Sequence, residues 1–214
     1  SGRNFWINIE GKNSWSVTGA SALQKAGKFN EKTEKSSMIG GFLWHEVIRE
    51  NEELGVKSAV TSFVPVTEDT VELNKVVIKN ISSEKLEFTP TVAVPLYCRS
   101  AGDIRDHRHV TSLLNRVTIK ENGVLVKPTM CFDERGHTIN NTSYGVFGTN
   151  ENNETPKRFY PSWEEFIGEG GSFDWPASVV KNVDLAYKVE DTIDGYEAVG
   201  AFSFEKTILE PGKE

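Results

Sequence analysis

Apolar and polar residues alternate with a period of two along several short stretches of this chain. The clearest stretch runs from Leu86 to Cys98. Its apolar residues on one face are Leu86, Phe88, Val92, Val94, Leu96 and Cys98. This period is typical of a β-strand with one buried face. Because proline cannot donate to a neighbouring strand, Pro90 and Pro95 predict an edge strand or a break at a bulge.

Other stretches rich in β-branched and aromatic residues predict further short strands. They are Lys57–Val64, Thr70–Ile78, Arg116–Lys120, Val124–Phe132, Ser143–Gly148, Val183–Val189 and Val199–Leu209. Glu121-Asn122-Gly123 predicts a hairpin turn, since Asn-Gly tolerates the positive φ that such turns require. Ser82–Glu84 predicts a second turn, which gives the connectivity of a meander.

Helix signals are few. Ser162 followed by Glu165 fits a capping box, and Gly168 stands where the resulting short helix would end. The polar stretch 149–157 lacks apolar periodicity and predicts a loop. The chain of 214 residues is therefore predicted to be all-β, a large antiparallel β-sandwich with one or two short helices, forming a single domain over residues 1–214.

Composition excludes two classes of partner. No stretch approaches the roughly 20 apolar residues needed to cross a bilayer, so no membrane partner is expected. The net charge of −7 argues against nucleic acid, whose phosphates are bound by clustered Lys and Arg. Cys98 and Cys131 do not make a disulfide framework. Two small buried thiols in a reducing cytosol are favoured over a bridge.

The densest polar cluster contains Arg105, His107, Arg108 and His109. These side chains can donate to phosphate or to sugar hydroxyls, which makes them candidates for the edge of a substrate site. The alternative is a surface loop held by weak Arg–Asp pairs. His107 and His109 share one side of an extended strand, but zinc needs three or four ligands, so no metal site is predicted.

A second polar group, Asp133, Arg135 and His137, follows an apolar strand. It forms a turn or contacts substrate across a domain or subunit boundary. Among the five tryptophans, Trp44 lies in a strand-like run and is predicted to be core. Trp163 and Trp175 are candidates for an interface or a sugar-stacking surface, since an aromatic face covers the apolar side of a pyranose.

Four segments in order carry a resemblance to a known family. They are NFWINIEGKNSWSVTGASA at 4–22, Gly41–Asn80, RDHRHVTSLLNRV at 105–117 and FIGEGGSFDWP at 166–176. Together they resemble the N-terminal domain of the inverting disaccharide and oligoglucan phosphorylases of glycoside hydrolase family 94. The resemblance implies a β-supersandwich like that of galactose mutarotase, placed before an (α/α) barrel that carries the active site, usually in a homodimer.

The family cleaves a β-glucosidic bond with inorganic phosphate and releases α-glucose 1-phosphate, without a cofactor. An acid protonates the leaving oxygen while phosphate attacks from the opposite face. In the family that acid is an Asp of the barrel, and no counterpart of its motif occurs before Glu214. The resemblance therefore implies a non-catalytic domain of a bacterial cytoplasmic enzyme, with its own downstream catalytic domain and a β-glucan oligosaccharide as partners.

Two other functions stay open at this point. The first is a free-standing carbohydrate-binding module, for which Trp163 and Trp175 would supply the sugar contacts. The second is an aldose epimerase, suggested only by the analogy of fold, with His107 or His109 paired with a Glu as acid and base.

Overall fold

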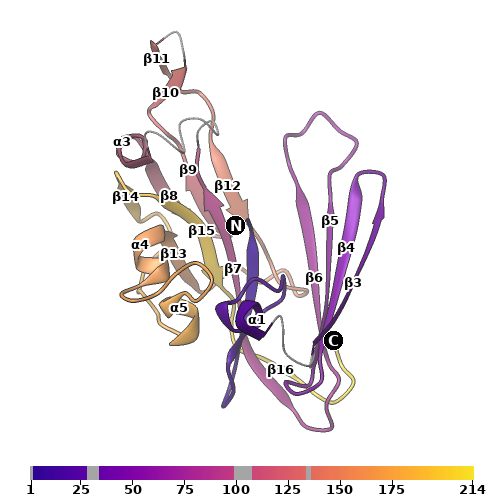
Figure 1. Cartoon of the computed structure of the whole chain (residues 1–214). Coiled ribbons are helices and arrows are strands. Elements are labelled where there is room, and N and C mark those ends of the chain that lie inside the picture. The colour runs from indigo at the N-terminus through magenta and orange to yellow at the C-terminus, as the bar shows by residue number, and fades with distance from the viewer. Residues whose placement is uncertain (1, 28–33, 99–107, 134–135) are drawn as a thin grey trace. The chain divides into compact units, whose positions relative to one another are not determined.

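A computed structural model describes residues 2–27, 34–98, 108–133 and 136–214 (Figure 1). Its elements are mostly antiparallel strands with a few short helices, which confirms the predicted all-β class. The contacts divide the chain into two compact units. The first unit comprises Ser1–Asn4 and Thr89–Glu205, and the second comprises Phe5–Phe88 and Lys206–Glu214. None of the described helices is long and apolar enough to cross a membrane.

The second unit contains an antiparallel four-stranded sheet whose order follows the chain (Figure 1). Its strands are β3 (Glu34–Gly41), β4 (Trp44–Asn51), β5 (Val56–Phe63) and β6 (Leu73–Asn80). Strand β1 (Asn4–Ile9) pairs with β2 (Ser14–Ser16), and β16 (Thr207–Leu209) pairs with the start of β7 (Leu86–Leu96). Helix α1 (Ala22–Ala26) begins with a capping box of Ser21 and Gln24.

Alternate residues of these strands build the core of the second unit. Its buried members are Ile7, Ile9, Trp15, Val17, Val56, Val60, Ile78, Leu86 and Phe88. A buried amide closes one end of this core. Asn80 Nδ2 donates to the carbonyl oxygens of Glu84 at 2.7 Å and Leu209 at 2.9 Å, which ties the end of β6 to β16.

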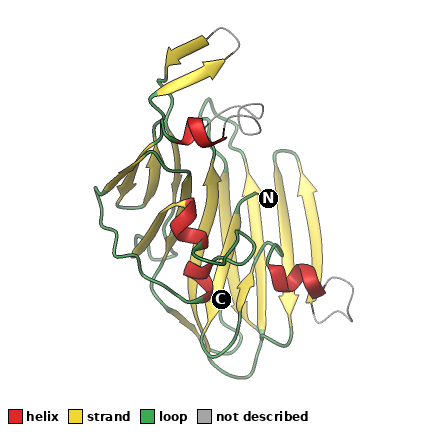
Figure 2. Cartoon of the chain, turned by 60° about the vertical axis from the view of Figure 1, so that its left-hand side comes forward, coloured by secondary structure: helices red, strands yellow, loops and turns green. Residues whose placement is uncertain are grey.

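The first unit packs two sheets against each other (Figure 2). One contains β13 (Arg158–Ser162), β15 (Ala198–Ser203) and most of β7. The other has the order β12 (Tyr144–Phe147), β9 (Gly123–Val126), β8 (Arg116–Lys120) and β14 (Thr192–Asp194). Their shared core consists of Val117, Ile119, Val124, Val126, Phe159, Ala198, Phe202 and Phe204. This face-to-face packing is that of a β-sandwich.

The remaining elements of the first unit are short. Strands β10 (Met130–Asp133) and β11 (Gly136–Ile139) form a separate hairpin. The helices are α3 (Arg108–Ser112), α4 (Trp163–Ile167) and α5 (Ala177–Val180). Figure 1 shows α4 and α5 beside β13, and α3 near the same end of the unit as the hairpin.

Most predicted strands are present with shifted ends, but three predictions need correction. Val124–Phe132 and Val199–Leu209 each form two strands, because 127–129 and 204–206 leave the extended pattern. Val183–Val189 is not a strand. Ala186 has a φ of 60°, and the Tyr187 hydroxyl donates to the Glu165 carboxylate, so side-chain contacts rather than a ladder fix this segment.

The interpretation of the two prolines is also wrong in part. Strand β7 runs unbroken past both, without a register shift against β15. The break lies in its partner, between β15 and β16. Pro90 still accepts a hydrogen bond from the Phe204 N–H at 3.0 Å, because proline lacks only the donor. At the start of β7, β16 pairs on one side and the Glu10 N–H donates to the Glu87 carbonyl on the other, so this end is not an edge.

The hairpin predicted at Glu121–Gly123 is confirmed, with Lys120 paired to Gly123. Glycine is needed there for a different reason from the predicted positive φ. A Cβ at Gly123 would lie 2.0 Å from the Val146 carbonyl oxygen, so only glycine lets β12 approach. The helix predicted after Ser162 is confirmed as α4, but as half a capping box: the Ser162 hydroxyl accepts from the Glu165 N–H, while the Glu165 carboxylate binds the Tyr187 hydroxyl.

Two burial predictions are wrong. Trp44 is 42% exposed rather than core, because it lies on the face of the four-stranded sheet that points away from the unit's core. Cys98 is only partly buried, since it follows the end of β7, and its thiol donates to the Leu96 carbonyl at 3.4 Å. The side chain of Cys131 lies outside the described part of the structure.

Candidate functional site

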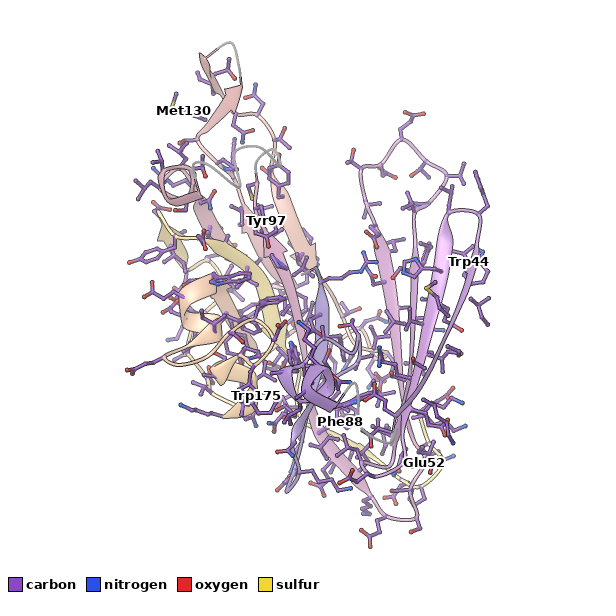
Figure 3. The ribbon with its side chains drawn as sticks, in the orientation of Figure 1. Trp44, Glu52, Phe88, Tyr97, Met130 and Trp175 are labelled. Atoms are coloured by element: carbon purple, nitrogen blue, oxygen red, sulfur yellow. The ribbon has the colours of Figure 1, made fainter. Side chains whose placement is uncertain are left out.

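A shallow depression in the first unit lies where strands β7 and β13 end and strands β8 and β15 begin. It is lined by Leu96, Tyr97, Asn115, Trp163, Glu197 and Ala198. Figure 3 shows Tyr97 at this end of the unit. The enclosed space of the depression is only about 10 Å³, which is the room of about one water molecule. Pockets that enclose a drug-sized ligand measure roughly 300–1,000 Å³, so this depression offers a surface contact rather than an enclosing pocket.

Trp163 is held rigidly in the wall of the depression. Its backbone N–H donates to the Glu197 carbonyl at 2.8 Å. Its ring stacks on Phe173 with the centroids 4.8 Å apart and the planes at 7°. Phe173 in turn packs at 5.8 Å against the buried Phe166 of α4. One face of the indole is thus covered by protein, which makes Trp163 a packing residue as well as a candidate contact.

Asn115 fixes the loop that supplies Glu197. Its buried Nδ2 donates to the Tyr196 carbonyl at 3.0 Å, and its own carbonyl accepts from the Gly195 N–H at 3.0 Å. Arg116 adds an ion pair with Asp194 at 3.6 Å. Three bonds therefore hold the β14–β15 connection against the start of β8, and they fix the position of the Glu197 backbone.

A buried chain of hydroxyls crosses the sheet formed by β7, β15 and β13. Thr91 Oγ1 lies 2.7 Å from Ser203 Oγ, which donates to the Tyr160 hydroxyl at 3.3 Å. The Tyr160 hydroxyl donates to the Val183 carbonyl at 2.7 Å. Burial raises the pKa of Tyr160, because the phenolate would lose its hydration. These bonds satisfy polar groups in the core and fix the register of β7, β15 and β13.

Glu165 and Tyr187 form a second polar contact on α4. The Tyr187 hydroxyl donates to the carboxylate at 2.8 and 3.1 Å. Burial first, and then the hydrogen bond to Glu165, raise the pKa of Tyr187 to about 12. A phenol that keeps its proton to such a pH is a poor acid or base near neutrality. This pair therefore fixes the segment 183–189 against the helix.

The β10–β11 hairpin and α3 leave the sandwich close to the depression. The Thr129 N–H donates to the Leu114 carbonyl at 3.0 Å, one residue before Asn115. Asn140 anchors the other strand of the hairpin, since its buried Nδ2 donates to the Pro128 carbonyl at 2.7 Å. Figure 3 shows Met130, the first residue of β10, at this end of the unit. The hairpin and the segment that follows α3 therefore meet beside the depression.

The residues predicted for the site fall in different places. Arg105, His107 and Arg135 lie outside the described residues. Arg108 and His109 are the first residues of α3.

Asp133 pairs with Gly136 across the hairpin, and His137 pairs with Phe132. Trp163 lines the depression, whereas Trp175 forms an antiparallel bridge with Ser172 in the turn before α5. Of the predicted residues that the structure describes, only Trp163 lines the depression.

Sequence reasoning missed Tyr97, Asn115 and Glu197. No motif marks them, because they come from three separate segments and meet only in the folded chain. The sequence offered only their positions relative to the predicted strands as a signal. Tyr97 lies near the end of the alternating run Leu86–Cys98, and Asn115 and Glu197 lie one and two residues before predicted strands. Polar and aromatic residues at such points lie at the rim of a sandwich, where loops carry function.

The lining of the depression combines aromatic and polar side chains. Trp163 and Tyr97 present aromatic surface, and Glu197 and Asn115 bring polar groups to it. Glycoside cleavage uses a pair of acidic groups or one acid with an external nucleophile. Glu197 is the single carboxylate in the lining. Over the described residues, no three His, Cys, Asp or Glu side chains are placed to hold a metal.

Comparison with known families gives one match over the entire chain. A family model described as glycosyl hydrolase 94, supersandwich domain, matches residues 1–214. No curated protein matches the sequence.

Proposed function

The chain belongs to the glycosyl hydrolase 94 supersandwich family, and we propose that it is the non-catalytic N-terminal domain of a β-glucoside phosphorylase. The parent enzyme would use inorganic phosphate as co-substrate to convert a β-glucan disaccharide or oligosaccharide to α-glucose 1-phosphate. The observation that carries this proposal is the family match over residues 1–214. The parent enzyme is proposed to be a cytoplasmic bacterial homodimer.

The arrangement of the first unit supports a role in support and recognition. The residues that line its depression include one carboxylate, but no Lys, Arg or His that could hold the attacking phosphate. In the proposed enzyme the reactive acid belongs to a downstream helical domain. The segments that begin at α3 and at the β10–β11 hairpin would face that domain or the second subunit. Their polar residues Arg108, His109, Asp133 and His137 would then lie near substrate.

A second candidate function is sugar binding by the chain on its own. The observation that favours it is the depression itself, where Trp163 and Tyr97 lie beside Glu197 and Asn115. Aromatic faces cover the apolar side of a pyranose, while carboxylate and amide groups bind its hydroxyls. The proposed epimerase activity gains no support from the residues that the structure describes.

The two candidates are separated by one pair of measurements. The first compares glucose 1-phosphate formation by the native polypeptide with formation by the same polypeptide lacking residues 1–214. We expect the shortened enzyme to lose most of its activity or its folded state, and full activity without residues 1–214 would contradict the supporting role. The second is calorimetry of the chain with short β-glucans. Micromolar binding that Trp163→Ala abolishes and Trp175→Ala leaves unchanged would favour the binding module.

A further inference from the structure

The four-stranded sheet of the second unit has a face that its own core does not cover. Along β5, Val56 and Val60 point into the core, so Lys57, Ala59, Thr61 and Phe63 point to the opposite side. The register extends this side across the neighbouring strands. We call the side of β4, β5 and β6 that carries Phe63 the outer face.

Residues on the outer face form four rows across the strands. The rows are Trp44, Phe63 and Leu73; Glu46, Thr61 and Lys75; Ile48, Ala59 and Val77; and Glu50, Lys57 and Lys79. Apolar rows therefore alternate with rows that carry a Glu on β4 and a Lys on β6. Figure 3 shows Trp44 and Glu52 toward opposite ends of this sheet.

The apolar rows are unusual for a face that contacts water. An antiparallel sheet with one solvated face normally places polar residues on that face. Here Trp44, Phe63 and Leu73 are 42%, 37% and 41% exposed. A group of exposed apolar side chains such as this row marks a candidate interaction site. A partner that covers the face would explain why these positions are apolar.

Two local features at one end of the sheet add to the apolar surface of the outer face. The ring of Trp44 lies over Gly41, where a Cβ would come within 2.3 Å of the indole nitrogen. The turn between β3 and β4 exposes 87% of Phe42 and holds Leu43 at a φ of 61°. A leucine in the left-handed region is strained, and such strain clusters at functional positions. Both features extend the apolar surface at the same end of the sheet.

We propose that a second copy of this chain covers the outer face, with the two sheets face to face and a two-fold axis running parallel to β5. Such an axis lays β4 of each copy over β6 of the other. Glu46 then faces Lys75 of the second copy, and Trp44 faces its Leu73. Because the contact is isologous, each pairing occurs twice.

The alternation of rows fits this axis. Apolar rows meet apolar rows, and a Glu on β4 meets a Lys on β6 in both charged rows. The central residues Phe63, Ala59 and Thr61 meet their own counterparts on the axis. The only like-charge contact is Lys57 with itself, and Glu50 already pairs with Lys57 at 3.4 Å within each copy. Complementary charges across an interface fix its register.

The area of the outer face sets the expected affinity of the dimer. Three strands of eight residues cover about 14 Å by 26 Å, or about 370 Å² per copy and about 750 Å² in total. Stable complexes bury roughly 1,200–2,000 Å² in total. Even with the exposed turn at Phe42 added, the isolated chain should form a weak dimer that is populated only at high micromolar concentration.

This interface deepens the homodimer proposed above, and it rests on that part of the proposed function alone. It needs neither phosphate nor sugar. Loss of phosphorolysis would therefore leave the interface standing, and a failure of the interface would leave the enzymatic proposal untouched.

Sedimentation velocity over roughly 10–500 µM tests the proposal, since weak complexes have dissociation constants in this range. We expect the unaltered chain to change from mainly monomer to mainly dimer as its concentration rises over this range. Glu46→Lys and Lys75→Glu should each weaken the dimer about tenfold or more, because each places like charges opposite one another twice. A mixture of the two variants should dimerise again, since the lysine introduced in one chain then meets the glutamate introduced in the other. Glu151→Lys, on an exposed loop of the first unit, is the matched control.

Circular dichroism of each variant checks that the chain is folded. A chain that stays monomeric at every concentration would overturn the proposal and leave the face to another partner. Dimers indifferent to both charge reversals, or single variants that do not recover on mixing, would overturn the proposed axis.

Discussion

The stack of Trp163 on Phe173 gives the sharpest prediction for the depression. If the stack holds the wall in place, the two rings depend on each other for stability. Phe173 is 7% exposed and Trp163 is partly exposed. Replacing a buried aromatic residue with Ala costs about 3–5 kcal/mol, so we expect a loss of about 3 kcal/mol for Phe173→Ala and about 2 kcal/mol for the more exposed Trp163→Ala.

The double variant should lose less than the sum of the single losses. An aromatic pair contributes about 0.5–1.5 kcal/mol beyond buried area, and removing either ring already abolishes that contribution. The coupling energy should therefore be about 1 kcal/mol. Urea unfolding followed by far-UV circular dichroism measures it, because removing a tryptophan would distort a fluorescence signal.

A matched control is Phe147→Ala on β12, which belongs to the opposite sheet of the same unit. Its loss should add to that of Phe173→Ala. If Trp163 and Phe173 also behave additively, within about 0.3 kcal/mol, the stack does not support the wall. Trp163 would then be available for other contacts, and the role assigned to it here would be refuted.

Three further predictions concern the scaffold. A Cβ at Gly200 would lie 2.3 Å from Val146 Cγ2, so Gly200→Ala should cost about 1–3 kcal/mol by overpacking, and Val146→Ala should recover part of the loss in the same urea assay. Asn80→Ala leaves two carbonyl oxygens without their donor and should cost about 2–3 kcal/mol, with faster hydrogen exchange where β6 meets β16. Tyr187 should titrate near its raised pKa of about 12 in ultraviolet absorbance, and Glu165→Gln should lower that pKa. Because the folded pKa of Tyr187 exceeds the unfolded value of about 10, its contribution to stability is complete below pH 10 and is lost as the pH rises toward 12.

Alternation along the sequence found several strands that have one buried face, although β1 and β13 were not among the predicted strands. Leu86–Cys98 became β7 and Arg116–Lys120 became β8, because each packs one side against a core. Strand β3 was not predicted, because nearly all its residues are exposed and its sequence shows no alternation of apolar and polar residues. Trp44 was taken for core because a sequence shows that a residue is apolar but not which face it occupies. An apolar residue on an exposed face and an apolar residue in the core look alike in the sequence.

The depression was beyond sequence reasoning for a related reason. Leu96, Asn115, Trp163 and Glu197 are far apart in the chain, and they meet only because strand ends converge. Trp163 was identified from its residue type and from its place beside the glycine-rich segment 168–171. At Gly123 the local structure was predicted correctly, but the reason for the glycine was not. The hairpin was predicted correctly, but the close approach of β12 that requires glycine depends on a third strand whose position the local sequence does not encode.

The most direct test of the central claim is phosphorus NMR of the purified chain with short β-glucans and inorganic phosphate. The account predicts that the phosphate signal stays unchanged, because the chain supplies scaffold and recognition while the reactive acid lies in another domain. Formation of glucose 1-phosphate by residues 1–214 alone would contradict it.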